Sequence, residues 1–253
     1  MRGFESYYDE KKELNRRINL DFADAGIRFE DIDMAFIDAD VKIGAGTFIC
    51  IGVEIRSGTV IGRDCRVEKG STIISSNIGD GCTVGQHSRL ESVEIADRVD
   101  IIQSIITDSV VGDRTSVGPF AYVRPGSRIG SDCRIGDFVE IKNSFIGDRT
   151  KISHLTYVGD SDLGSDINLG CGVVFVNYDG RDKHRTKVGD GAFIGCNVNL
   201  IAPVTIEDNA YIAAGTTVTR DVPAGSLSVG RASEKNIKGW VEKRGLLKRK
   251  ERK

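Results

Sequence analysis

The chain repeats an aliphatic residue every six positions over most of its length. From Ile43 the sequence reads IGAGTF ICIGVE IRSGTV IGRDCR VEKGST, and later segments such as VGDGAF IGCNVN LIAPVT IEDNAY keep this period. Six is a multiple of neither 3.6 nor 3.5, so the period excludes a helix. It fits a prism of short parallel strands, in which each hexad is one face, three hexads make a coil and the first aliphatic residue points inward. Glycines permit the corners, where φ is often positive. The sequence therefore predicts an all-β solenoid.

The chain divides into three predicted regions. Residues 1–32 form an N-terminal segment with a helix over 5–25, residues 33–222 form the solenoid, and residues 223–253 form a basic C-terminal helix or arm. From Ser233 to Lys253 there are nine Lys or Arg against three Glu, a net charge of +6. After Phe175 the next regular hexad begins only at Val188, which predicts a loop over 176–187 that projects from the prism. Loops on a rigid scaffold are common sites of function.

Composition excludes several classes of partner. Acidic and basic residues nearly cancel, at 37 against 35, so the chain is not a polycation that binds nucleic acid. No run approaches the roughly 18 apolar residues that cross a membrane, and the N-terminus lacks the apolar core of a signal peptide. Six cysteines are scattered singly, without the spacing of a metal site. We expect a cytoplasmic protein with reduced thiols and no nucleic-acid or membrane partner.

Two cations occupy a hexad position that is otherwise mostly small or acidic. Arg124 in VRPGSR and Lys142 in IKNSF are three hexads apart, which places them on the same face of adjacent coils. Stacked cations repel each other unless an anion lies beside them, so they predict a phosphate site. The alternative is a solvated pair that neighbours such as Glu140 neutralise. Arg56 also breaks the rule, which weakens the signal from this position alone.

The three histidines do not predict a metal site. His87, His154 and His184 lie in distant regions of the sequence, whereas a shared metal needs ligands placed together. His154 lies twelve residues beyond Lys142, two faces further round the prism. A neutral imidazole near a phosphate pocket is a plausible general base. A lone surface histidine is the alternative.

Five segments in chain order resemble one enzyme family: GPFAYVRPG, GDFVEIKN, HLTYVGDSDLGSDINLGCG, NYDGRDKHRTKVGD and NLIAPVTIEDNAYIAAGTTVTRDVP. They are similar to the acetyltransferase half of the bifunctional glucosamine-1-phosphate N-acetyltransferase / N-acetylglucosamine-1-phosphate uridyltransferase family, from about residue 15 to the tail. The resemblance implies a left-handed parallel β-helix and a homotrimer whose coenzyme groove runs between neighbouring prisms. It also implies that acetyl-CoA acetylates the amine of glucosamine 1-phosphate, without a metal.

The resemblance also implies roles for individual residues. His154 is the expected base, and the amino-sugar phosphate is expected on Arg124, Lys142, Tyr157, Asn168 and Lys183. Acetyl-CoA is expected along Cys171, Asn177, Tyr178, Cys196, Ala214 and Arg231, with the basic tail near its phosphates. Cys171 and Cys196 stand where the family commonly has Ala and Ser. They are either tolerated small residues or thiols that react with thiol reagents and that acetyl-CoA protects.

A Gly-rich nucleotide-binding loop like that of the family's other half does not occur in this sequence. Uridylyl transfer is therefore not expected on this polypeptide, and either a separate uridyltransferase supplies it or the chain is a piece of a longer protein. Two other functions remain open. The chain could acetylate a different phosphorylated or nucleotide-linked amino sugar, or it could be a non-catalytic β-helix that binds sugar phosphates.

Overall fold

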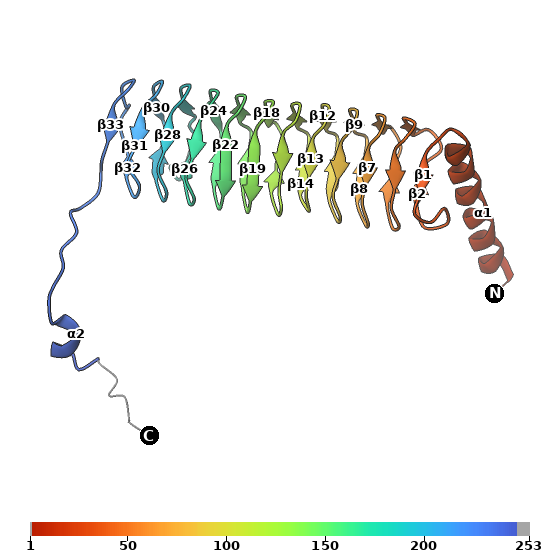
Figure 1. Ribbon diagram of the computed structural model, residues 1–253, viewed down its shortest axis with the longest axis horizontal. Coiled ribbons are helices and arrows are strands. Elements are labelled where there is room, and N and C mark those ends of the chain that lie inside the picture. The colour runs from red at the N-terminus through yellow and green to blue at the C-terminus, as the bar shows by residue number, and fades with distance from the viewer. Residues whose placement is uncertain (1, 247–253) are drawn as a thin grey trace.

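The computed structural model describes residues 2–246 and consists mainly of one long stack of coils (Figure 1). Three parallel sheets of 12, 11 and 10 strands form the sides of the prism in this part of the chain. This is the predicted left-handed parallel β-helix. We call the sheets A, B and C in the order in which the chain first enters them. The turn from a sheet A strand to the next sheet B strand is the A–B corner, and the turn that follows is the B–C corner.

The strands are short because each one ends at a corner. Sheet A contains β1 (Arg28–Phe29), β4 (Phe48–Ile49), β7 (Arg66–Val67), β10 (Thr83–Val84), β13 (Asp100–Ile101), β16 (Ser116–Val117), β19 (Arg134–Asp137), β22 (Lys151–His154), β25 (Asn168–Leu169), β28 (Phe193–Ile194), β31 (Tyr211–Ile212) and β33 (Leu227–Ser228). Sheet B contains β2 (Phe36–Ile37), β5 (Glu54–Ile55), β8 (Thr72–Ile74), β11 (Arg89–Glu91), β14 (Ile105–Thr107), β17 (Tyr122–Val123), β20 (Glu140–Lys142), β23 (Tyr157–Gly159), β26 (Val174–Val176), β29 (Asn199–Ile201) and β32 (Thr217–Val218). Sheet C contains β3 (Lys42–Ile43), β6 (Val60–Ile61), β9 (Asn77–Ile78), β12 (Glu94–Ile95), β15 (Val110–Val111), β18 (Arg128–Ile129), β21 (Phe145–Ile146), β24 (Ser161–Leu163), β27 (Thr186–Val188) and β30 (Val204–Ile206).

The core is a continuous column inside the prism. The aliphatic residues that open the hexads are buried, for example Ile101, Ile135 and Ile152 in sheet A. Phe175 is the largest of the fully buried side chains in the described residues. Because every coil rests on the next, this column holds the outward side chains of neighbouring coils in a fixed register.

Many corners have positive φ, but glycine does not occupy all of them. Phe120, Phe138 and Leu155 adopt φ values of 58°, 55° and 46° at successive A–B corners. The left-handed conformation costs a bulky residue about 1 kcal/mol or more, and the coils on either side hold it in place. The rings of Phe120 and Phe138 stack with their centroids 5.4 Å apart.

The two ends of the stack differ. Helix α1 (Arg2–Asp24), predicted over 5–25, lies against the first coils, as Figure 1 shows. Asn19 is buried there, and its amide donates to the carbonyl groups of Ile32 and Ala35 at 2.7 and 2.9 Å. At the other end the chain leaves β33 in an extended arm that carries the short helix α2 (Trp240–Lys243). Residues 247–253 of the predicted basic arm lie outside the described residues.

Candidate active site

The two cations predicted to hold a phosphate lie at equivalent positions on neighbouring coils. Strands β17 and β20 pair in register, so Arg124 and Lys142 are stacked at the end of sheet B. Each already has a carboxylate partner. Arg124 Nη1 donates to Glu140 Oε1 at 2.7 Å, and Lys142 Nζ donates to both carboxylate oxygens of Asp160, at 2.9 and 3.1 Å. The carboxylates therefore offset the repulsion between the two cations without a bound anion.

Asp160 connects several parts of the B–C corner. Its carboxylate accepts hydrogen bonds from Asn143 Nδ2 at 2.6 Å and from Asn177 Nδ2 at 2.5 Å, in addition to those from Lys142. Burial by itself would raise the pKa of Asp160, but the hydrogen bonds from these three side chains outweigh it and hold that pKa below its usual value. The hydrogen bond to Asp160 is the main cause that raises the pKa of Lys142. The pair is therefore ionised at neutral pH.

The segment between β26 and β27 forms an ordered loop rather than an open excursion. The Asp179 carboxylate accepts hydrogen bonds from the backbone N–H groups of Arg181 and Asp182, at 2.8 and 2.7 Å, and lies 2.8 Å from His184 Nε2. The backbone hydrogen bond from Asp182, the hydrogen bond with His184 and the one from Arg181 together lower the pKa of Asp179 to about 2. One carboxylate thus holds the tip of the loop together.

Further contacts fix the loop at the B–C corner. Tyr178 and Lys183 pair in an isolated antiparallel bridge. Arg185 forms an ion pair with Asp162, and its guanidinium also donates to the backbone carbonyl of Asn143, 3.1 Å away. The loop is therefore tied to the coils beside it, and it brings an additional ammonium group to the cationic edge of sheet B.

His154 has a carboxylate partner on the preceding coil. Asp137 and His154 stand opposite one another in β19 and β22, and Asp137 Oδ1 lies 2.5 Å from His154 Nδ1. The hydrogen bond with His154 is the main cause that lowers the pKa of Asp137, so the carboxylate is ionised at neutral pH and acts only as an acceptor. Nδ1 therefore carries a proton, and in the neutral ring Nε2 has a free lone pair. Since 53% of the His154 side chain is exposed, Nε2 can take a proton from a ligand.

The predicted base and the cations lie on opposite edges of sheet B. His154 ends β22 at the A–B corner, whereas Lys142 ends β20 at the B–C corner. Tyr157, in β23, lies between these edges, and its hydroxyl group is 3.5 Å from Asn177 Nδ2. Asn168 begins β25 in sheet A, on the other side of the A–B corner. Within one chain, the base and the predicted phosphate-binding cations are therefore separated by the length of a sheet B strand, across the outer surface of that sheet.

Four of the six residues expected along acetyl-CoA gather at the A–B corner. The pairing of β25, β28 and β31 places Cys171, Cys196 and Ala214 at equivalent positions on successive coils. Arg231 joins them, since its Nη1 donates to the carbonyl oxygen of Ala214 at 2.7 Å. One edge of the prism thus carries these four residues together with the predicted base.

The other two expected coenzyme residues lie elsewhere within the chain. Asn177 and Tyr178 belong to the loop at the B–C corner. The Asn177 amide is buried against Asp160, and the Tyr178 side chain is exposed. Within one chain these two residues therefore lie with the cations and not with the coenzyme edge.

Asp137 and Asp160 did not emerge from the sequence as site residues. Asp137 precedes His154 by 17 positions, and Asp160 follows Lys142 by 18 positions. Each separation is one coil, so a search for acids one coil away from the predicted base and cations finds both residues. Such a search also finds acidic residues that only line the surface of successive coils. The three-dimensional contacts are needed to distinguish these from the acids that contact the predicted base and cations.

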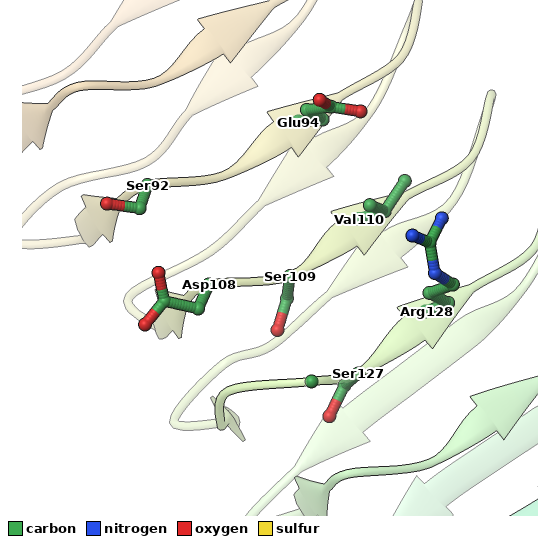
Figure 2. Close-up of a pocket in the computed structure, with 8 residues that line it drawn as sticks. Ser92, Glu94, Asp108, Ser109, Val110, Ser127 and Arg128 are labelled. Carbon is green, nitrogen blue, oxygen red and sulfur yellow. The ribbon is translucent and has the colours of Figure 1, made fainter.

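A shallow cleft of about 290 Å³ lies at the B–C corner on the N-terminal side of Lys142 (Figure 2). It is lined by Ser92, Glu94, Asp108, Ser109, Val110, Gly126, Ser127 and Arg128. None of the predicted site residues lines it.

Among the described residues, no group of three or more His, Cys, Asp or Glu side chains is placed to hold a metal ion. The helices within 2–246 include none with the length and apolar character of a membrane span.

Comparison with known proteins identifies the repeat and the relatives. The family model for the bacterial transferase hexapeptide (six repeats) matches residues 108–143 and 185–220. The bifunctional protein GlmU of Clostridium beijerinckii is 49% identical over 93% of this chain, and that of Clostridium acetobutylicum is 48% identical over 94%. In both cases the match covers 48% of the relative, so this chain spans about half the length of these proteins.

A solved structure supports the fold. The UDP-N-acetylglucosamine acyltransferase LpxA of Bacteroides fragilis superimposes with a TM-score of 0.53 over 77% of this chain and 69% of that protein, at 16% sequence identity. At this identity the likeness concerns the fold alone. The repeats, the β-helix and the sequence identity agree: the chain is a hexapeptide-repeat protein and a homologue of the GlmU proteins over about half of their length.

Proposed function

We propose that this chain transfers the acetyl group of acetyl-CoA to the amine of glucosamine 1-phosphate. The observation that carries the proposal is the Asp137–His154 pair, because it leaves an exposed imidazole with a free Nε2 at one edge of sheet B. The cations at the other edge and the homology with GlmU proteins add support. The motifs quoted above resemble the acetyl-transferring half of that family.

The reaction needs a base because the substrate amine is largely protonated near neutral pH. In the proposed mechanism His154 Nε2 accepts a proton as the amine nitrogen attacks the carbonyl carbon of the thioester. The new C–N bond forms, the C–S bond breaks, and coenzyme A leaves as a thiolate to which the imidazolium passes its proton. Asp137 stabilises the imidazolium that results, and no covalent enzyme intermediate is needed. Alignment of both substrates on one surface turns a bimolecular step into a positioned one.

The sugar phosphate is assigned to the cationic edge. Arg124, Lys142 and Lys183 supply three positive charges against the carboxylates of Glu140 and Asp160, so one positive charge remains to attract a phosphate. The sugar ring then extends across the outer surface of sheet B toward the base at the A–B corner.

Polar side chains along this path would hold the sugar, and the A–B corner would hold the coenzyme. Tyr157 and Asn168 are assigned to the sugar, and acetyl-CoA is assigned to the edge that carries Cys171, Cys196 and Ala214. The loop residues expected along the coenzyme lie at the opposite corner of the same chain. In the proposed assembly a neighbouring chain supplies them to this coenzyme edge.

A homotrimer with a groove between prisms is part of the proposal. Within one chain the two edges are separated by a strand width, and a neighbouring prism packed at the A–B corner would enclose the surface between them. Phe120, Phe138 and Leu155 are exposed apolar side chains at that corner, beside His154. Apolar patches of this kind mark contact surfaces. Sedimentation equilibrium should give three times the chain mass of 27.5 kDa, and a monomer under all conditions would contradict this part of the proposal.

The test of the function is the release of coenzyme A from acetyl-CoA in the presence of glucosamine 1-phosphate. We expect turnover in the wild type and a loss of about 10²–10⁴-fold in His154→Ala. His87→Ala, an exposed histidine at the A–B corner four coils away, serves as the matched control and should retain wild-type turnover. Glucosamine 6-phosphate and UDP-glucosamine test the related substrates. Binding of glucosamine 1-phosphate without turnover of any of these would favour the non-catalytic alternative and overturn the proposal.

A further inference from the structure

Two of the six cysteines stack directly on one another at the A–B corner. Strands β25 and β28 pair with Leu169 opposite Ile194, so Cys171 and Cys196, each two residues further on, occupy the same position on consecutive coils. The backbone confirms the close approach. The N–H group of the residue after Cys196 donates to the Cys171 carbonyl at 2.8 Å, and a Cβ added to Gly170 would lie 2.6 Å from the Cys196 nitrogen.

These two thiols are the ones that solvent reaches. Cys171 is partly exposed and Cys196 is exposed, whereas the other four cysteines are buried. Among the buried ones, Cys65 and Cys82 form a second stacked pair, since β7 and β10 are in register. The proximity of these two thiols lowers the pKa of Cys65 and raises that of Cys82. Cysteines in register on neighbouring coils of this prism therefore come within reach of each other.

The exposed pair continues the line of side chains that begins with Asp137 and His154. Pairing of β22 with β25 places His154 one coil before Cys171, and pairing of β28 with β31 places Ala214 one coil after Cys196. The thiols thus lie between the proposed base and the alanine expected beside the coenzyme. A change in their bonding alters the surface on which the thioester would lie.

We propose that Cys171 and Cys196 form a redox-sensitive dithiol, which oxidises reversibly to a disulfide and in that state blocks the coenzyme edge of the prism. The effect on acetyl transfer rests on the proposed function, whereas formation of the disulfide does not. The oxidant is a low-molecular-weight disulfide such as glutathione disulfide.

Oxidation proceeds in two exchange steps. The thiolate of one cysteine attacks a sulfur of glutathione disulfide, its S–S bond breaks and one glutathione leaves as a thiolate. The second cysteine thiolate attacks the protein sulfur of this mixed disulfide, the Cys171–Cys196 bond forms and the second glutathione leaves. The two protons from the cysteine thiols end on the two released glutathiones. The dithiol is oxidised by two electrons and glutathione disulfide is reduced by two.

The spacing of coils permits the bond and makes it easy to reduce. Adjacent parallel strands lie about 4.8 Å apart, which is within the range of about 4.4–6.8 Å between the Cα atoms of disulfide-bonded cysteines. Side chains in register point the same way, so their Cβ atoms lie somewhat further apart than the mean of about 3.8 Å in disulfides. A disulfide here is therefore strained, and strained, exposed disulfides are the labile ones.

Peptide mapping tests the dithiol directly. The folded chain is incubated with glutathione disulfide, remaining thiols are alkylated, and the chain is then digested with trypsin. We expect a disulfide between the peptides 152–181 and 188–220, which contain one cysteine each, and its disappearance after treatment with dithiothreitol. The buried pair is the internal control, because a disulfide between peptides 64–66 and 70–89 should appear only in the unfolded chain. Mixed disulfides with glutathione and no cross-link between 152–181 and 188–220 would overturn the proposal.

Coenzyme binding and activity test the consequence. Desulfo-coenzyme A, which has no thiol, should slow the cross-link at least about tenfold, and the oxidised chain should bind it at least about tenfold more weakly. Acetyl transfer should fall by the same factor on oxidation and return with dithiothreitol, whereas the double variant Cys171→Ala/Cys196→Ala, which can form neither the mixed nor the internal disulfide at this edge, should show equal turnover with and without glutathione disulfide. A cross-link with unchanged coenzyme binding would refute the blocking role. A cross-linking chain that binds desulfo-coenzyme A but shows no transfer when reduced would refute the proposed function and leave the dithiol standing.

Discussion

The ammonium group of Lys142 lies 2.9 Å from the carboxylate of Asp160 on the next coil. The two side chains are 18% and 7% exposed, so the pair is largely removed from water. Asn143 and Asn177 donate to the same carboxylate. One buried acid thus joins a predicted phosphate-binding lysine to the loop that interrupts the repeat, which makes Asp160 a positioning residue for both.

Replacement of Asp160 by Asn should destabilise the fold more than replacement of a surface acid. The ammonium of Lys142 would remain partly buried without its counter-ion, and removal of one partner from such a pair costs about 3 kcal/mol. Asp132→Asn is the control, since its ion pair with Arg114 is exposed to solvent, which screens such pairs, and its loss should cost much less. Urea unfolding followed by circular dichroism measures both losses. Equal losses in the two variants would show that Asp160 has no special role.

The lowered pKa of Asp160 predicts that the stability of the fold depends in part on pH in the acid range. Its pKa is lowered in the folded state, so the ionised carboxylate stabilises the fold above the unfolded pKa of about 3.9. That contribution decreases as the pH falls through the folded pKa, over a range that begins at about pH 5. The thermal midpoint of the wild type should therefore fall further between about pH 5 and pH 3 than that of Asp160→Asn. Parallel curves for the two proteins would contradict the expectation.

The ordered structure of the loop should depend on the hydrogen bonds of Asp179 at every pH at which the prism is folded. Because the pKa of Asp179 is about 2, its carboxylate stays ionised down to about pH 3 and keeps its hydrogen bonds. Amide hydrogen exchange of residues 177–185, corrected for the intrinsic rate, should therefore be equally slow at about pH 4 and pH 7. Asp179→Ala should exchange faster at both values, whereas Asp182→Ala, which offers only its backbone to these contacts, should not. Loss of protection in the wild type at the lower pH would argue against this account.

The fold was predictable because the six-residue period of aliphatic residues marks the positions whose side chains point into the prism. An aliphatic residue such as Ile135 or Ile152 must occupy every inward position, so the core leaves a mark every six residues. The corners leave a weaker mark. Glycine was expected where φ is positive, yet Phe120 and Phe138 adopt φ values of 58° and 55°, since the stacked coils impose the conformation on whichever residue stands there.

The candidate site was predictable only in part, for a related reason. The stacking of Arg124 on Lys142 follows from their spacing, because residues three hexads apart share a face. Their carboxylate partners could not be assigned in the same way. Coil length varies along the chain, and Asp160 reaches Lys142 only because its side chain is buried at the B–C corner. The burial of Asn177 likewise depends on that carboxylate rather than on the repeat.

Gly136 should be among the least replaceable residues near the site. A Cβ at this position would overlap the backbone oxygen of Ser153, and backbone cannot move aside as a flexible side chain can. Gly136→Ala should therefore force apart the coils that carry Asp137 and His154, at a cost of about 3 kcal/mol in the free energy of unfolding. Gly180→Ala is the control: it has open space but a φ of +97°, and it should cost about 1 kcal/mol. Urea unfolding ranks the two, and the reverse order would refute the argument.

Replacement of Asp137 should lower kcat, because Asp137 orients His154, and it should leave substrate binding almost unchanged. Asp137→Asn keeps a hydrogen-bonding side chain but removes the charge that stabilises the imidazolium, so kcat for acetyl transfer should fall about 10–100-fold. The KM for acetyl-CoA should change less than about threefold, because the residue contacts the base and not the coenzyme. Asp137→Glu should recover part of kcat, since the carboxylate is restored one methylene further out.

The double variant Asp137→Asn/His154→Ala should be no slower than His154→Ala alone if the two residues act as one unit. A rise in KM with kcat unchanged, or additive losses in the double variant, would show that Asp137 supports the corner structurally and does not orient the base.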